Sequence, residues 1–309
     1  MRNETSLPQF ILLGLSDLGY SQIPLSLLIL LVYVATLVGN LLIISLVVTD
    51  SHLRTPMYFL LGNLSVLDIL TPSVSASHLS FDIFTGNTII SYSTCITQVF
   101  FFIWLVCTEV FLLAVMSYDR YVAICHPLHY TTMVNIFLCV QMMSGICIFS
   151  SMYSLVHTLS LLRLVFCDST IIPGFFCELY QLIQLSCSDT SLNILLLSLL
   201  GVGFPFIAFS ITFFSYVFIF KTILRIKMLE GKLKAFSTCS SHLTVVFIFY
   251  SASYFNYFHP KTKGFLVDRL LSTIYTIVTP FLNPVIYSLR NSDLKGAIHR
   301  ALVRVGFRS

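Results

Sequence analysis

Residues 117–130 read Ser-Tyr-Asp-Arg-Tyr-Val-Ala-Ile-Cys-His-Pro-Leu-His-Tyr, and they follow a long apolar run that begins near Cys95. A charged pair at the end of a membrane helix is costly, so Asp119 and Arg120 indicate charges that have a function. In one state the guanidinium can pair with the neighbouring carboxylate, and in another its fork of N–H donors can bind backbone carbonyls of a partner. The alternative is a plain juxtamembrane charge pair. Asp119-Arg120-Tyr121 taken alone would favour the plain charge pair. The whole stretch from residue 117 to residue 130 favours a switch.

The composition of the chain excludes a water-soluble globular protein. Of its 309 residues, 57% are hydrophobic and only 10% are charged, whereas a soluble domain carries about 25% charged residues. Seven continuous apolar stretches approach the roughly 20 residues that a membrane-crossing helix needs. Their continuity favours helices over the alternating strands of a barrel. The stretches are residues 23–48, 57–79, 96–122, 136–159, 192–224, 243–258 and 270–289.

The predicted architecture is an all-α membrane protein, a seven-transmembrane helix bundle in a single domain, residues 1–309. Residues 1–22 form an extracellular tail, 23–289 the bundle and 290–309 a cytoplasmic tail. The sixth stretch is short, and we expect it to extend back through residues 236–242. In the last tail, apolar residues recur at helical spacing. This pattern predicts a short amphipathic helix on the inner membrane face, capped by Ser292 or Asp293.

Charge placement predicts that the N-terminus lies outside. With that orientation the cytoplasmic side holds 12 of the 17 Lys and Arg residues, in agreement with the positive-inside rule. The basic balance is therefore a topology signal and gives no support for nucleic-acid binding. Residues 10–15 are too short and weak for a signal-peptide core, so the first span is expected to insert uncleaved. Asn3 opens an Asn-Glu-Thr glycosylation acceptor on the outer tail.

The nine cysteines fall into two groups. Four lie on the oxidising side, where three pairings are open to them. These are Cys95, Cys167, Cys177 and Cys187. The other five lie in spans or face the cytosol and are interpreted as packing residues. Cys239 and His242 share a helix face, but two ligands without a third make a poor metal site, so packing is the stronger interpretation and no metal is expected there.

A second motif closes the seventh stretch, where residues 280–287 read Pro-Phe-Leu-Asn-Pro-Val-Ile-Tyr. Pro284 removes a helix hydrogen bond and kinks the chain. Asn283 can satisfy the freed backbone groups or polar neighbours, and Tyr287 follows about one turn later. A simple kink is the alternative, but the Asn-Pro-x-x-Tyr spacing favours a specific role.

Two carboxylic acids fall within the predicted spans, Asp68 in the second and Glu109 in the third. Isolated ionised carboxylates are prohibitively costly in lipid, so both should face the bundle interior. The pair could share a cation such as a sodium ion, or carry a proton. A hydrogen-bonded polar cluster is an equally good interpretation.

Several strings together resemble vertebrate olfactory receptors, a branch of the rhodopsin-like G-protein-coupled receptors, over nearly the whole chain. The strings are Gly39-Asn40, Thr55-Pro56-Met57-Tyr58-Phe59, 116–130, Ser215-Tyr216, 234–243 and 280–291. The third-span motif, with Tyr118, resembles that of the tetrapod-type class of these receptors. That class tends to sense airborne, less polar odorants. The departures from the family pattern touch none of the switch positions. They are Arg54, Ser117 and Phe281.

The resemblance implies disulfides and functional residues. Cys95 should bridge Cys177, and Cys167 should bridge Cys187. The ligand should lie in the outer half of the bundle, between spans three, five, six and seven, with ordinary interhelical packing as the alternative for each contact. The expected ligand contacts are Phe102, Ile103, Val106, Cys107, Val110, Phe204, Tyr250, Ser253, Tyr254, Tyr257, Thr273 and Thr276. The expected switch and G-protein coupling residues are Asp119, Arg120, Tyr121, Tyr216, Lys234, His242, Asn283, Pro284 and Tyr287.

The absence of certain residue types narrows the chemical class of the expected ligand. The outer half of span three carries Phe102 and no acid, which argues against amines, and span seven has no Lys for a retinal Schiff base. Strongly anionic ligands are disfavoured because no Arg or Lys cluster faces the expected site. The expected ligand is a small, mostly neutral, hydrophobic volatile molecule, such as an alcohol, aldehyde, ketone or ester. Its binding would shift a population of packings, move the inner end of span six away from Arg120, and activate a stimulatory olfactory-type G protein that raises cyclic AMP.

Three other classes have less support. The short outer tail and loops argue weakly against a receptor for large peptides. A transporter or channel would show repeat halves and broken helices near the midplane, and neither is evident. An enzyme would need a metal-ligand set or a nucleophile with a base, so we expect no enzyme and no cofactor. We expect the protein to lie in the plasma membrane. Its expected partners are a small-molecule odorant, a heterotrimeric G protein, the lipid bilayer and a candidate trafficking chaperone.

Overall fold

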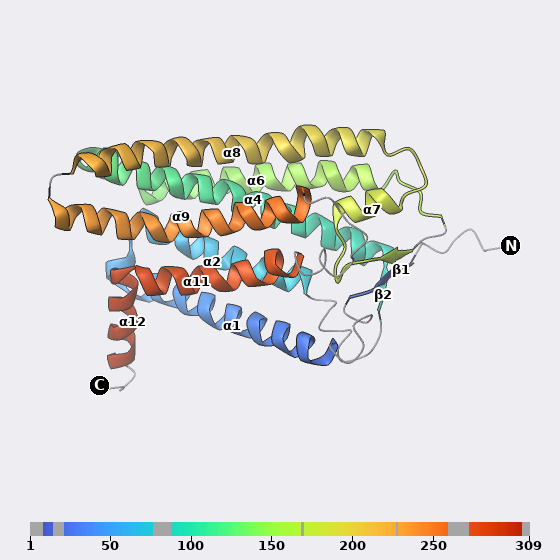
Figure 1. Ribbon diagram of the computed structural model, residues 1–309, viewed down its shortest axis with the longest axis horizontal. Coiled ribbons are helices and arrows are strands. Elements are labelled where there is room, and N and C mark those ends of the chain that lie inside the picture. Colours follow the sequence, from blue (N-terminus) through green and yellow to red (C-terminus); the bar gives the residue numbers. More distant parts are fainter. Residues whose placement is uncertain are drawn as a thin grey trace.

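The computed structural model describes residues 9–14, 22–76, 88–167, 170–226, 228–258 and 272–304 of the chain. Seven long helical segments run side by side and form a bundle (Figure 1). The first six are α1 (Gln22–Thr49), α2 (Pro56–Ser75), α4 (Tyr92–Cys125), α6 (Ile136–Leu161), α8 (Ser191–Arg225) and α9 (Leu229–Phe258). The seventh is a π-helical turn (Ile274–Val278) that continues into α11 (Thr279–Arg290). The predicted seven-helix bundle is therefore confirmed.

Five helices in the described part of the chain are long and apolar enough to cross a membrane: α1, α2, α4, α6 and α8. The other two segments are α9 and the seventh. α9 begins at Leu229, which confirms the expected backward extension of the sixth stretch, and its first turns carry the charged residues Lys232 and Lys234. α11 has only 12 residues because the helix changes to the π-helical turn at its start.

A small three-stranded sheet covers one end of the bundle, which we call the sheet end (Figure 1). β1 (Gln9–Leu12) lies in the middle, antiparallel to β2 (Ile89–Ser91) and parallel to β3 (Ile171–Ile172). The side chains of Phe10 and Leu12 are completely buried, so this part of the tail belongs to the folded domain. The strand was not predicted, because four residues of alternation are too short a signal.

The close approach of α1 to α11 explains the Gly39-Asn40 pair. A Cβ atom at Gly39 would lie 3.1 Å from the Pro284 ring, so glycine permits the contact. Pro284 has no N–H to donate to the carbonyl of Pro280, four residues earlier. Asn40 donates to that carbonyl instead, with Nδ2 3.4 Å from the oxygen. We expected Asn283 to satisfy the freed backbone groups or polar neighbours. Asn40 of α1 binds the freed carbonyl, and Asn283 binds a polar neighbour, Asp68, at 2.8 Å.

The last helix, α12 (Ser292–Arg304), crosses the opposite end of the bundle, which we call the α12 end (Figure 1). We expected Ser292 or Asp293 to cap it. The capping residue is instead Asn291, whose Oδ1 accepts hydrogen bonds from the backbone N–H groups of Asp293 and Leu294, at 2.9 and 3.1 Å. The side chain of Leu294 is completely buried, so the amphipathic helix places an apolar residue against the bundle as its pattern predicts.

An ion pair holds α12 to the connection between α1 and α2. Arg300 donates to the Asp50 carboxylate from Nη2 at 2.7 Å and from Nε at 2.9 Å. Asp50 also accepts from the backbone N–H of His52 at 3.0 Å. The Tyr58 hydroxyl of α2 adds a second link, 3.1 Å from Oδ1 of Asn291. The helix is thus attached at its start and near its end.

We expect the docking of α12 to be insensitive to pH near neutrality and to weaken only in acid. The His52 N–H and then the Arg300 guanidinium lower the pKa of the Asp50 carboxyl below its ordinary value of 3.8. A lowered folded-state pKa stabilises the protein above the unfolded pKa, and the contribution is lost as the pH falls through the folded pKa. Asp50→Asn mimics the protonated carboxyl and should loosen α12 at neutral pH.

Hydrogen–deuterium exchange of the α12 amides in the purified protein measures this effect. After correction for intrinsic rates, protection should be constant between about pH 6 and 8 in the wild type. It should be lower throughout that interval in Asp50→Asn, and unchanged in Lys295→Ala, which removes an exposed cation of the same helix. Equal protection of α12 in Asp50→Asn and the wild type would contradict the role of the ion pair.

Candidate ligand site and switch

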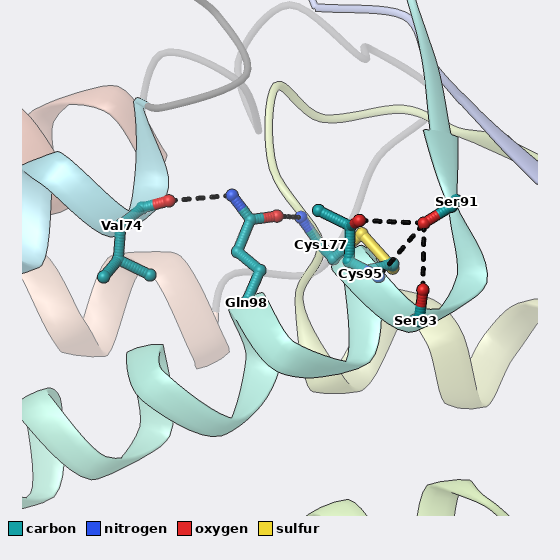
Figure 2. The surroundings of a disulfide bond; sticks show 7 residues. Val74, Ser91, Ser93, Cys95, Gln98 and Cys177 are labelled. Carbon is teal, nitrogen blue, oxygen red and sulfur yellow. Dashed lines mark hydrogen bonds between the residues drawn. A yellow bond between two sulfur atoms is a disulfide. The ribbon is translucent and has the colours of Figure 1, made fainter.

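A disulfide ties the loop at the sheet end to α4 (Figure 2). Cys95, in the first turn of α4, is bonded to Cys177 of the loop. About one turn along, Gln98 donates from Nε2 to the Val74 carbonyl at 2.8 Å, and its Oε1 accepts from the Cys177 backbone N–H at 2.9 Å. Gln98 therefore joins α2, α4 and the loop beside the disulfide.

The second disulfide joins Cys167 to Cys187 within the same loop. Both disulfides implied by the family resemblance are thus present. The stretch between these cysteines carries Phe175 and Phe176, and both side chains are buried. The Phe176 ring lies 4.9 Å, centroid to centroid, from that of Phe102 on α4. The loop therefore places an aromatic side chain against the expected ligand site.

The expected ligand contacts on α4 are covered but do not all belong to one cluster. Phe102, Cys107 and Val110 are buried, and Ile103 and Val106 are half-buried. Phe102, Val106 and Val110 belong to the main core of the bundle. Ile103 packs against the apolar cluster beneath the sheet. The helix thus connects the bundle interior to the sheet end.

Two expected ligand contacts face α6, which was left out of the predicted site. The Phe204 ring of α8 lies 4.9 Å from that of Phe149 and 5.8 Å from that of Tyr153, both on α6. The Cys107 thiol of α4 is next to the Ser150 hydroxyl, also on α6. Both residues therefore pack against the fourth span, which the prediction of a site between spans three, five, six and seven left out.

The expected contacts on α9 differ in their surroundings. The Tyr250 ring lies 5.2 Å from that of Phe209 on α8, and its hydroxyl is buried without a hydrogen-bond partner among the described residues. The Ser253 hydroxyl donates to the Phe249 carbonyl of its own helix at 2.8 Å. Tyr254 is 60% exposed. The structure therefore brings Tyr250 to the interior and leaves Tyr254 largely uncovered.

Two expected ligand contacts are on the seventh segment, and three other predicted residues lie outside the described structure. Thr276 is buried and donates to the Ser272 carbonyl at 2.7 Å, whereas Thr273 is half-buried. The side chains of Tyr257 and Lys234 lie outside the described part of the structure, as does Asn3. The roles of those three residues, like the roles of the other predicted site residues, stay predictions.

Glu178, a buried carboxylate beside Cys177, was not predicted from the sequence. It accepts hydrogen bonds from the Ser272 hydroxyl at 3.4 Å and from Gln181 Nε2 at 3.2 Å. It precedes the short helix α7 (Leu179–Leu185) and links the loop to the seventh segment. Its position directly after Cys177 could have indicated a buried role, because the disulfide fixes that part of the loop against the bundle.

At the α12 end, Asp119 is buried and accepts a hydrogen bond from the Tyr130 hydroxyl at 2.8 Å. Tyr130 begins α5 (Tyr130–Met133), in the connection after α4. Burial and then the charge of Asp119 raise the pKa of the Tyr130 phenol, so the hydroxyl keeps its proton and donates. Within the described part of the chain, Asp119 makes no ion pair with Arg120 at 4.0 Å or less. In place of the ion pair between Asp119 and Arg120, the structure has a hydrogen bond from Tyr130 to Asp119.

A hydrogen bond joins the α12-end halves of α8 and α9. The Tyr216 hydroxyl lies 2.7 Å from His242 Nδ1 and 3.4 Å from the Cys239 carbonyl. Tyr216, Cys239 and His242 are all buried. Tyr121 contacts His126 at 3.1 Å. Of the predicted switch residues, Tyr216 and His242 are therefore in direct contact, and Tyr121 packs against the apolar cluster that contains Tyr216.

The two membrane acids lie in the bundle interior, as expected. Asn283 Nδ2 donates to Asp68 Oδ1 at 2.8 Å, and Glu109 is close enough to Asp68 for its charge to act on it. The second oxygen of Asp68 and Oδ1 of Asn283 are buried without hydrogen-bond partners among the described residues. Tyr287 is buried one turn after Asn283. The cluster thus joins α2, α4 and α11 through oxygen-rich side chains.

The arrangement of the helices is that of a known class. The crystal structure of squid rhodopsin matches this structure with a TM-score of 0.65, over 91% of this chain and 85% of the rhodopsin chain, at 18% sequence identity. At that identity the likeness shows the fold. The protein therefore has the rhodopsin-like, seven-transmembrane fold.

The match to a sequence family is more specific than the match to a fold. The olfactory receptor family profile matches residues 29–305. Human Olfactory receptor 1C1 is 44% identical over 304 residues, which cover 98% of this chain and 97% of the relative. Human Olfactory receptor 7C1 is 45% identical over 99% of this chain and 96% of its own, and rat Olfactory receptor 1f45 is 45% identical over 97% and 96%. The chain belongs to the olfactory receptor family. It is therefore an odorant-sensing, multi-pass receptor of the plasma membrane that couples to G proteins, and not an enzyme.

Proposed function

We propose that this receptor binds small, mostly neutral, hydrophobic volatile molecules at the sheet end and activates a stimulatory olfactory-type G protein at the α12 end, raising cyclic AMP. The sheet end is extracellular and the α12 end cytoplasmic in this proposal. The charge distribution supports that orientation, because it places 12 of the 17 Lys and Arg residues on the cytoplasmic side. Residues 1–22, 23–289 and 290–309 are then the outer tail, the bundle and the inner tail.

The observation that carries the ligand proposal is the aromatic contact between the loop and α4. Phe176 lies against Phe102, at the level where a carboxylate would be needed to bind an ammonium group. The other expected contacts are mostly apolar, and the buried Tyr250 hydroxyl is available for one hydrogen bond. A largely apolar site with few polar groups selects small neutral ligands and orients them through those groups.

The proposed coupling runs along α9. This helix carries Tyr250 toward the sheet end and His242 about two turns away, where His242 contacts Tyr216 of α8. A ligand that contacts Tyr250 more favourably in one packing shifts the population toward that packing. The α12-end part of α9, including Lys234, would then move away from Arg120 and admit the G protein. Tyr216 and Tyr287 would stabilise the open form.

The acid cluster supports two versions of the same switch. The oxygens of Asp68, Glu109 and Asn283 suit a hard cation such as sodium. They suit equally well a proton held between the two carboxyl groups. In both versions a change in the packing of α2 against α11 alters the Asn283–Asp68 hydrogen bond, and so ties the cluster to receptor activation.

Cyclic AMP measured in cells that express the receptor and a stimulatory olfactory-type G protein tests this proposal. The probes are 1-octanol, octanal, 2-octanone and ethyl hexanoate, with octylamine and octanoate as charged counterparts. We expect responses among the neutral compounds and none to the charged ones. An epitope before Asn3, stained on intact cells, verifies surface expression and the outer N-terminus. Activation only by the amine or the carboxylate would contradict the ligand class, and a calcium signal without cyclic AMP would contradict the coupling.

A further inference from the structure

A buried histidine beside the ligand site has no role in the function proposed above. His157 lies near the sheet end of α6, and its side chain is only 1% exposed. Its Nε2 atom is buried and has no hydrogen-bond partner within the described part of the chain. Buried side-chain polar atoms are nearly always hydrogen-bonded, because an unpaired one loses its hydration without compensation. The imidazole therefore requires an explanation.

The neighbours of His157 connect it to residues already assigned to the ligand site. The Tyr153 ring, one turn earlier on α6, meets the imidazole edge-on at 4.7 Å. The same Tyr153 ring lies 5.8 Å from that of Phe204 on α8 and is close to the Cys107 thiol of α4. A single aromatic ring thus separates His157 from two expected ligand contacts, which come from two different helices.

The other polar groups around His157 are used to join the helices. Asn193 Nδ2 of α8 donates to the Ser160 hydroxyl at 2.9 Å, and Ser160 donates to the His157 backbone carbonyl at 2.7 Å. The Ser154 hydroxyl donates to the Phe100 carbonyl of α4. These bonds fix the backbone of α6 between α4 and α8 while leaving the imidazole nitrogen unused. The ring is therefore held in place and still has a hydrogen bond to give.

We propose that His157 Nε2 is a ligand-binding group and that α6 forms a further wall of the odorant site. The ligand it selects is a neutral molecule with one oxygen on a compact, aromatic or otherwise apolar body. An uncharged imidazole nitrogen donates to a carbonyl or accepts from a hydroxyl, according to its tautomer. The rings of Tyr153 and Phe204 border the apolar body through edge contacts. This inference rests on the proposed function and adds a residue and a ligand chemistry to it.

The direct test follows the imidazole ring by NMR in the purified full-length receptor. With ring-labelled histidine, the resonance lost in His157→Gln identifies the residue among the eight histidines. The probes are acetophenone, 1-phenylethanol and ethylbenzene, which share a carbon skeleton and carry a carbonyl, a hydroxyl and no oxygen. We expect the His157 resonance to move with at least one of the oxygenated compounds and not with ethylbenzene. A resonance that none of them moves, or that all three move equally, would overturn the proposal.

The functional test uses the same probes in the cyclic AMP assay, at matched surface expression. For the oxygenated agonist, His157→Phe should raise the half-maximal concentration roughly tenfold, as expected for one lost hydrogen bond, and His157→Gln less. Any response to ethylbenzene should be unchanged. Leu155→Ala is the control, because Leu155 is an exposed residue of the same helix.

The outcomes separate this inference from the proposed function. An unchanged half-maximal concentration in His157→Phe would overturn the role of His157 and leave the proposed function intact. A His157 resonance that moves with acetophenone in a receptor that gives no cyclic AMP would support the subsite and contradict the coupling. If His157→Phe raised the half-maximal concentration equally for all three probes, His157 would have a packing role alone, and the inference would be overturned.

Discussion

Arg120→Ala should abolish the cyclic AMP response while leaving the receptor at the cell surface. Arg120 makes no ion pair with Asp119 among the described residues, since Asp119 is bound by Tyr130. Its guanidinium is close enough to Tyr216, His242 and Tyr287 for its charge to act on all three. It therefore lies where α4, α8, α9 and α11 meet, with N–H donors available to the inserted G protein.

The expected reduction in the maximal response is at least about tenfold, because the active packing loses the donors that stabilise it. Arg120→Lys keeps the charge but not the planar fork of donors, so it should restore only a small part of the response. Lys295→Ala, which removes an exposed cation at the same end of the bundle, is the matched control and should signal normally. A full response from Arg120→Ala at equal surface level would refute the role assigned to this residue.

Much of the fold was predictable because the membrane imposes it. A continuous apolar run of sufficient length has few alternatives to a helix when every backbone polar group must be satisfied internally. The same constraint explains why the backward extension of the sixth stretch through residues 236–242 could be anticipated from its shortness. The start of α9 earlier still, at Leu229, was not anticipated. The strand β1 could not be anticipated. Its residues pair with segments about 80 and 160 positions away, and a single-sequence pattern does not report such distant pairing.

The positions of the site residues were predictable from motifs, but their partners were not. Asp119 was predicted to pair with Arg120 in one state, and here it is bound by Tyr130. The carbonyl freed by Pro284 is bound by Asn40 of α1. Such partners depend on how each helix is rotated in the bundle. A helix that is apolar all round gives little periodic signal for that rotation. For this reason the contact of Phe204 with α6 became visible only in the structure.

Replacing both Cys95 and Cys177 by serine should cause the largest loss of folded receptor. This disulfide spans 82 residues of sequence, and loop-closure entropy then contributes roughly 4–5 kcal/mol to stability. The Cys167–Cys187 bridge spans 20 residues, for which the same relation gives about 3 kcal/mol. Both values are upper bounds here, because the bilayer keeps the spans inserted when their packing is lost. The first bridge also positions Phe176 against Phe102, so its loss should disorganise the ligand site as well.

Surface staining and thermal unfolding of the purified receptor should therefore rank three variants. Cys95→Ser/Cys177→Ser should be the least stable, Cys167→Ser/Cys187→Ser intermediate, and Cys147→Ser, which replaces a free cysteine of α6, close to the wild type. Replacing both partners of a bridge avoids a free thiol that could pair wrongly. Equal stability of the two double variants would contradict the loop-length argument, since both lose one covalent bond and differ mainly in the length of chain that the bond closes. The stabilising element at the sheet end would then be the packing of Phe175 and Phe176 and the Gln98 hydrogen bonds, which do not depend on loop length.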